Sequence, residues 1–202
     1  MALLKEKIIE ESLQLLNESG LEGVTLRKLA KRLGVQAPAL YWHFKNKEAL
    51  VNELAEAILR NEFSEFEQSD ASEEWKKWFI HIFYRLRKAL ISYTDGGRVV
   101  AGAHLSLTMA EISEVAIKTL LDAGISLHKS RLLVLTAKHY TFGYVIEEQT
   151  TPSPEIINIF DLELFKKNYP LTIQSIEEYF ATGRTRDDLF IDGMEIIIGV
   201  QR

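Results

Sequence analysis

Residues 25–47 read TLRKLAKRLGVQAPALYWHFKNK, and this stretch holds six basic side chains and no acidic one. The basic residues are Arg27, Lys28, Lys31, Arg32, Lys45 and Lys47. The whole chain of 202 residues has a formal net charge of -5, so the remainder is strongly acidic. A short basic segment within an acidic protein confines the positive field to one surface. This pattern indicates a polyanionic partner for the segment.

The pattern of residues 25–47 also predicts two short helices. Thr25 is a favourable N-cap, apolar residues follow at 26, 29, 30 and 33, and Gly34 suits the left-handed end of a helix. A second helix is expected from about Ala37 through His43, because Pro38 is tolerated in a first turn. Two helices joined by a three-residue turn with glycine form a helix-turn-helix. On this pattern alone, a helical hairpin with solvated lysines is the alternative.

Three consecutive ring-bearing residues, Tyr41, Trp42 and His43, lie near the end of this segment. Successive side chains on a helix point about 100° apart, so three in a row cannot all face the core. At least one ring is therefore expected to be exposed beside Lys45 and Lys47. An exposed ring in this position favours contact with phosphate, sugar or a thymine methyl group.

A resemblance to the TetR family is carried by two strings, LRKLAKRLGV at 26–35 and PALYWHFKNKEAL at 38–50. They are similar to the N-terminal DNA-binding domain of that family, and most similar to its tetracycline repressors. Shorter matches extend the resemblance to residue 149, namely TDG at 94–96, GISL at 124–127, HYTFG at 139–143 and VIEEQ at 145–149.

The resemblance implies a ligand-responsive repressor that binds double-stranded DNA as a homodimer. Two recognition helices would lie in successive major grooves of a near-palindromic operator, and a small-molecule effector would release them. The residues expected to contact DNA are Thr25, Arg27, Lys28, Gln36, Ala37, Pro38, Ala39, Tyr41, Trp42, His43 and Lys47.

The rest of the chain also has helical patterns, so the sequence predicts an all-α protein. A three-helix headpiece with the helix-turn-helix is expected over 1–46, and a long connecting helix with a linker over 47–72. A helical body for effector binding and dimerisation is expected over 73–202. A first helix is expected to end at 17–20, and further helices are expected at about 47–66, 73–93, 98–105, 108–123, 127–149, 156–167, 171–182 and 189–200.

Composition excludes several classes of protein. The chain has no cysteine, which excludes disulfides, thiolate metal sites and a cysteine nucleophile. No stretch approaches 18 uninterrupted apolar residues, and the N-terminal segment is a charged amphipathic helix. We therefore expect neither a membrane partner nor a secretory signal, and a cytoplasmic location.

The effector pocket is expected to differ from that of the tetracycline repressors. The resemblance implies a metal-ligating histidine where this chain has Val100, and a threonine that holds a metal-bound water where it has Ala103. Valine supplies no donor to Mg²⁺, so we expect no metal, no cofactor and a small apolar or aromatic effector. The expected contacts are Phe63, Phe66, Ile82, Leu86, Val100, Ala103, His104, Ala116, His139 and Glu147. A structural role for His139 and Glu147 is the alternative.

The last predicted helix is unusually apolar, which favours a partner surface. The resemblance implies a four-helix bundle in which this helix and 127–149 pair across a two-fold axis. An ordinary core helix within one subunit is the alternative.

Two other functions fit the sequence less well. An enzyme is disfavoured because the chain has no Gly-rich phosphate loop, no GxSxG and no HExxH, although His104, His139, Glu147 and Asp95 are an available acid–base set. An architectural, ligand-independent DNA-binding protein is disfavoured because it needs no body of about 130 residues.

Overall fold

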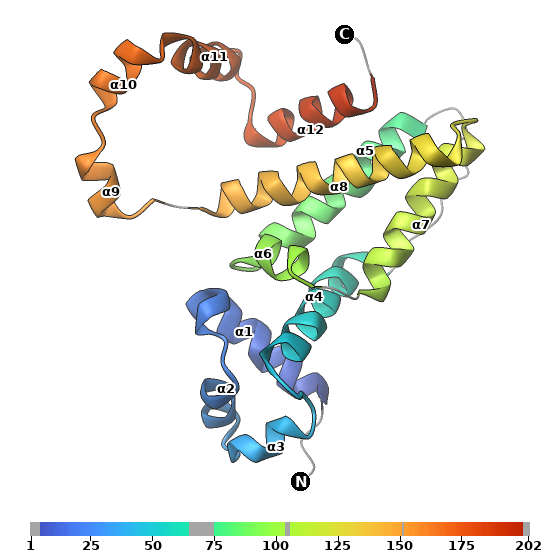
Figure 1. Cartoon of the computed structure of the whole chain (residues 1–202), viewed down its shortest axis with the longest axis vertical. Helices are drawn as coiled ribbons and strands as arrows, with labels where there is room; N and C mark the ends of the chain where they lie inside the picture. The colour runs from blue at the N-terminus through green and yellow to red at the C-terminus, as the bar shows by residue number, and fades with distance from the viewer. Residues whose placement is uncertain (1–4, 65–74, 104–105, 151, 200–202) are drawn as a thin grey trace. The chain divides into compact units, whose positions relative to one another are not determined.

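The computed structural model describes residues 5–64, 75–103, 106–150 and 152–199. Over these residues the chain forms twelve α-helices and no strand, which confirms the all-α prediction (Figure 1). The helices belong to two compact units, residues 1–149 and 150–202. None of the helices within the described ranges is long and apolar enough to cross a membrane.

The headpiece consists of α1 (Lys5–Gly23), α2 (Leu26–Leu33) and α3 (Ala37–Tyr41). As the sequence predicted, Thr25 caps α2 by accepting a hydrogen bond from the Lys28 backbone N–H, and Gly34 ends it with φ 67°. The following turn leads into α3, which ends at Tyr41 and is shorter than expected. The first helix does not stop at Gly20 but kinks there and continues to Gly23.

Arg32 joins α2 to α1. Its guanidinium donates hydrogen bonds to Glu11 at 2.7 Å, Glu18 at 2.5 Å and Gln14 at 2.8 Å. The hydrogen bonds to Glu18 and Glu11 raise the pKa of Arg32, so the charge is permanent. Arg32 is thus held against α1 by three of its side chains.

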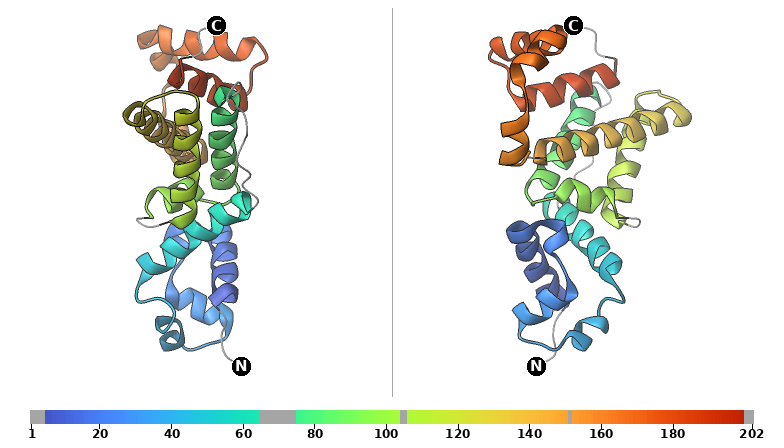
Figure 2. Two further views of the ribbon diagram at one scale, coloured as in Figure 1. Left: turned by 90° about the vertical axis from the view of Figure 1, so that its right-hand side faces the viewer. Right: turned by 60° about the vertical axis from the view of Figure 1, so that its left-hand side comes forward.

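The connecting helix α4 (Lys47–Phe63) begins in the headpiece and ends in the body (Figures 1 and 2). Asn46 caps it by accepting a hydrogen bond from the Ala49 N–H at 2.8 Å. It packs against α1 in the headpiece and against α5, α6 and α7 in the body. Its buried apolar side chains include Leu50, Leu54 and Ile58, so both parts of the first unit share this helix as core.

The body of the first unit contains α5 (Trp75–Ile91), α6 (Gly96–Ala101), α7 (Leu107–Asp122) and α8 (Leu127–Gln149). The long helix α8 packs against the other three (Figure 2). The sequence located α8 correctly at both ends. It predicted that α7 starts at Thr108, but the structure shows Ser106 as the N-cap and Leu107 as the first helical residue.

The side chains of Arg87 and Gln149 make hydrogen bonds that fix α8 to α5 and α6. Arg87 of α5 is 1% exposed and donates to both carboxylate oxygens of Glu148, at 3.0 and 2.7 Å, so its buried charge is paired. The side chain of Gln149 donates to the carbonyls of Leu90 at 3.3 Å and Tyr93 at 2.7 Å, and accepts from the Gly97 N–H at 3.2 Å.

The second unit contains α9 (Pro154–Ile159), α10 (Leu162–Asn168), α11 (Pro170–Ala181) and α12 (Arg186–Ile197). The single helix expected over 156–167 is two helices, because Asp161 caps α10 by accepting a hydrogen bond from the Leu164 N–H at 2.9 Å. A capping box between Thr185 and Asp188 starts α12.

Candidate DNA-binding surface and effector pocket

The helix-turn-helix presents an aromatic and basic surface. Tyr41 is 55% exposed and Trp42 is 90% exposed, and His43 is exposed beside them. A tryptophan so fully in solvent is unusual for a protein surface and makes this surface a candidate for binding. The sequence predicted at least one exposed ring, and all three are exposed.

A surface hollow of about 520 Å³ brings the start of α2 and the end of α3 together. Its lining residues are Thr25, Leu26, Arg27, Tyr41, Lys45, Asn46 and Lys47. Of the other residues expected to contact DNA, the exposed ones are Lys28, Gln36 and Pro38, and the half-buried ones are Ala37 and Ala39. Lys47 also donates to the Leu21 carbonyl at 3.1 Å, so its ammonium group is held near the headpiece surface.

The headpiece is bonded to the body at the start of α6. Asp95 has φ 57°, and its side chain accepts a hydrogen bond from the Leu21 N–H at 2.8 Å. The neighbouring Thr94 donates through its N–H to the Asn17 side chain at 2.9 Å and through its hydroxyl to the Asn17 carbonyl at 3.2 Å. Three hydrogen bonds therefore join the C-terminal part of α1 to the turn before α6.

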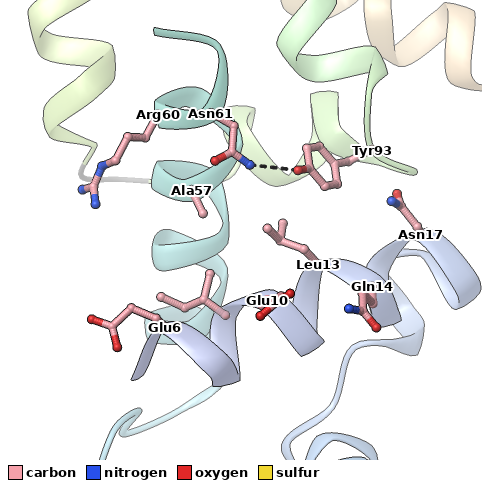
Figure 3. Close-up of a pocket in the computed structure, with 10 residues that line it drawn as sticks. Glu6, Glu10, Leu13, Gln14, Asn17, Ala57, Arg60, Asn61 and Tyr93 are labelled. Carbon is pink, nitrogen blue, oxygen red and sulfur yellow. Dashed lines mark hydrogen bonds between the residues drawn. The ribbon is translucent and has the colours of Figure 1, made fainter. Parts of the chain in front are cut away.

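A groove of about 440 Å³ lies beside this joint, between α1, α4 and the residues after α5 (Figure 3). Leu13 and Ala57 line it from α1 and α4, and Asn61 donates a hydrogen bond to the Tyr93 hydroxyl at 2.9 Å. No local pattern in the sequence indicates this groove, because its walls are far apart in the chain.

A pocket of about 380 Å³ lies in the body between α6, the start of α7 and the middle of α8. Its lining residues are Val100, Ala101, Ala103, Ser106, Met109, Lys138, His139 and Phe142. Three of the residues expected to contact the effector, Val100, Ala103 and His139, are brought together here.

The other residues expected to contact the effector lie elsewhere. Four of them are packed in the core of the first unit, namely Phe63, Ile82, Leu86 and Ala116. Glu147 is exposed on α8 and is not among the residues that line the pocket. Phe66 and His104 lie outside the described residues.

Five lining residues were not predicted from the sequence, namely Ala101, Ser106, Met109, Lys138 and Phe142. A signal was present for Phe142, because a residue three positions after His139 shares its helix face. No local signal could have indicated Ser106 or Met109, whose place in the pocket depends on how α7 packs against α8.

The pocket does not fit a hydrated Mg²⁺ ion. Its described lining includes one imidazole and no carboxylate, and Val100 stands where the resemblance implies a metal-ligating histidine in the tetracycline repressors. Mg²⁺ requires oxygen-rich octahedral coordination. Among the described residues, no three His, Cys, Asp or Glu side chains gather into a group that could hold a metal ion.

Two family models match this chain. A family model described as "Bacterial regulatory proteins, tetR family" matches residues 8–54. A second, described as "Tetracyclin repressor-like, C-terminal domain", matches residues 69–201. The tetracycline repressor protein class C of Escherichia coli is 35% identical over 98% of this chain and 90% of its own length.

Solved structures show the same likeness. TetR (class A) in complex with 5a,6-anhydrotetracycline and magnesium has a TM-score of 0.66 and 29% identity, covering 98% of this chain and 96% of that one. BioQ with its double-stranded DNA operator has a TM-score of 0.67 and 26% identity, covering 95% of this chain and 98% of that one.

Proposed function

Because the chain belongs to the tetR family of bacterial regulatory proteins, we propose that it represses transcription as a homodimer on a near-palindromic operator and that a small effector releases it. Family membership makes it a DNA-binding transcription regulator and not an enzyme. The observation that carries the proposal is the exposed aromatic and basic surface of the helix-turn-helix. We place its action in the cytoplasm, where operator DNA lies.

We assign DNA binding to residues 1–46, the connection to 47–72, and effector binding and dimerisation to 73–202. In this assignment α3 is the recognition helix, and Gln36, Ala37 and Ala39 face the bases. An alanine makes no bidentate hydrogen bond to a base, although its methyl group can contact a thymine methyl. The tetracycline operator should therefore bind poorly.

Selection from a pool of random duplexes tests the operator proposal. The enriched sequences should contain an inverted repeat with half-site centres about 34–36 Å apart. In the selected duplex, Lys47→Ala should weaken binding and reduce the salt slope by about one. Lys76→Ala, a body lysine, is the control and should change neither. Enrichment without an inverted repeat, or an unchanged slope for Lys47→Ala, would contradict the proposed docking.

We assign the effector to the pocket between α6, α7 and α8. Val100, Met109 and Phe142 give it an apolar side, and Lys138 and His139 give it hydrogen-bond donors. This lining supports a small apolar or aromatic effector with a polar or acidic group. Metal-chelated tetracycline is not the expected effector, because the lining does not fit the ion.

Thermal shift measurements with anhydrotetracycline test the effector proposal. A ligand that binds the folded state raises Tm according to its concentration and Kd. We expect no Mg²⁺-dependent rise in Tm and no release of the selected operator. A rise that appears only when Mg²⁺ is added would overturn the assignment. A screen of aromatic carboxylates should give hits that His139→Ala weakens without lowering operator affinity.

The homodimer proposal is supported by apolar side chains that the second unit leaves in solvent. The most exposed are Ile159 at 82%, Leu171 at 78% and Ile196 at 78%. A chain with this much exposed apolar surface gains by association. An interface that includes α8 and α12 would belong to the class above roughly 2,000 Å². Sedimentation should show a dimer at micromolar concentration, and Ile196→Asp should weaken it, whereas a monomeric wild type would refute the proposal.

A further inference from the structure

Glu56, in the middle of α4, binds the first turn of α7. One carboxylate oxygen accepts hydrogen bonds from the Ser106 hydroxyl at 2.7 Å and the Thr108 N–H at 3.3 Å. The other accepts from the Thr108 hydroxyl at 2.7 Å and from Arg60 at 3.2 Å. The side chain of Glu56 is only 14% exposed, so one carboxylate from the connecting helix satisfies several donors of the body.

The charge of Glu56 suits this position. The N–H groups in the first turn of a helix have no intrahelical partner, and a negative charge there is favourable. Burial raises the pKa of the Glu56 carboxyl, but hydrogen bonds from Thr108, Ser106 and Arg60 lower it by more. The net pKa lies below the ordinary value of 4.5, so the carboxylate is charged at neutral pH.

Ser106 connects this contact to the effector pocket. Its hydroxyl donates to Glu56 and accepts from the Met109 N–H at 3.1 Å. Both Ser106 and Met109 line the pocket, whereas Glu56 is not among the lining residues. A molecule that takes the Ser106 hydroxyl, or shifts the first turn of α7, must therefore disturb the hydrogen bonds that Glu56 accepts.

Glu56 itself belongs to the helix that connects the body to the DNA-binding headpiece. Glu56 lies on α4, which is the next helix after the recognition helix α3 and packs against α1. A change in how α4 is held against α7 therefore alters the placement of the headpiece. The contact joins the two regions to which we assign effector and operator.

We propose that Glu56 is the positioning residue that couples the effector pocket to the DNA-binding headpiece. In the operator-binding state, its carboxylate bonds α4 to the first turn of α7. Effector binding weakens these hydrogen bonds. The inference rests on the proposed function, because it assumes that effector and operator bind the same chain. Coupling between two sites is reciprocal, so operator binding must also change the first turn of α7.

Hydrogen exchange with and without the selected operator tests this reciprocity without an effector. In the wild type, operator binding should change the exchange rates of the backbone amides of residues 106–110 by about threefold or more. In Glu56→Gln, which keeps the shape but removes the charge, that response should fall below about twofold at saturating operator, and operator affinity should fall by about threefold or more because the weakened contact no longer favours the operator-binding placement. Thr108→Val, which removes one donor from the other side, should reduce the response as well.

Glu62→Gln is the matched control. Glu62 is also on α4, but its carboxylate accepts a hydrogen bond at 2.9 Å from Arg85, which belongs to α5 and not to α7. It should leave the response of residues 106–110 intact. Equal loss in both variants, or operator binding by the wild type without a response, would overturn the coupling while leaving the proposed function in place. Failure to select any operator would overturn both.

Discussion

Replacing Gly20 with alanine should break the joint between α1 and the turn before α6. Gly20 has φ 64° and ψ 179°, a conformation that is essentially restricted to glycine and costs other residues roughly 1–3 kcal/mol. A Cβ atom at this position would lie 2.8 Å from the carboxylate of Asp95, so that side chain must move. Asp95 then loses its hydrogen bond from the Leu21 N–H, and hydrogen bonds to charged groups contribute about 1.5–3 kcal/mol.

Because Asp95 is partly exposed, water offsets some of this loss, and we expect the free energy of unfolding to fall by about 2–5 kcal/mol. Urea unfolding followed by circular dichroism measures it. Gly34→Ala is the control, because Gly34 also has a positive φ, of 67°, but a Cβ atom there would meet nothing within 4 Å, and the expected cost is roughly 1 kcal/mol. Equal costs for the two variants would refute the argument.

The double variant Gly20→Ala with Asp95→Ala separates the backbone strain at position 20 from the loss of the Asp95 hydrogen bond. Asp95→Ala removes the carboxylate that the new methyl group displaces. If Gly20→Ala acts partly through Asp95, the two costs should be less than additive by about 1 kcal/mol or more. Strict additivity would mean that backbone conformation alone accounts for the effect.

Three further outcomes are expected. Trp42→Ala should weaken operator binding by about tenfold, or about 1.4 kcal/mol, and change Tm little, because the ring is 90% exposed; competition binding and thermal unfolding measure the two effects. Arg87→Ala should lower the free energy of unfolding by about 3 kcal/mol in urea, because it leaves the Glu148 charge without its buried partner. Because the pKa of Glu56 is lowered by folding, its contribution to the free energy of unfolding is present above about pH 4.5 and is lost as pH falls through the folded-state pKa. The Tm difference between wild type and Glu56→Gln should therefore shrink in acid.

Local sequence signals predicted both ends of α2 and the start of α3, because these boundaries depend on residues within the helix-turn-helix. The end of α3 at Tyr41 was not predicted. Thr25 caps its own helix, and Gly34 ends it through its own backbone conformation. The start of α7 was misplaced for the opposite reason. The hydroxyl of Thr108 bonds to Glu56, a partner 52 positions away, and Ser106 takes the role of N-cap. Windows of a few residues contain no information about such a partner.

The candidate site shows the same limit. The sum of charges over 25–47 counted Arg32 as part of the DNA-facing field, but three side chains of α1 hold its guanidinium. In the effector pocket, the resemblance supplied Val100 and His139, whereas Lys138 and Met109 follow only from how three helices meet. The exposed side chains of one helix can be predicted from the sequence of that helix. The lining of a pocket formed by several helices can be predicted only when the packing of those helices is known.

The side-chain amide of Gln149 makes the last residue of α8 a practical crossover point for chimeric regulators. It is bonded to the carbonyls of Leu90 and Tyr93 and to the Gly97 N–H, all within the first unit. A splice made after this residue keeps the three bonds and exchanges only the second unit. A segment taken from a related regulator at this point could therefore change the pairing preference of the chain, so that two such regulators coexist in one cell without forming mixed assemblies.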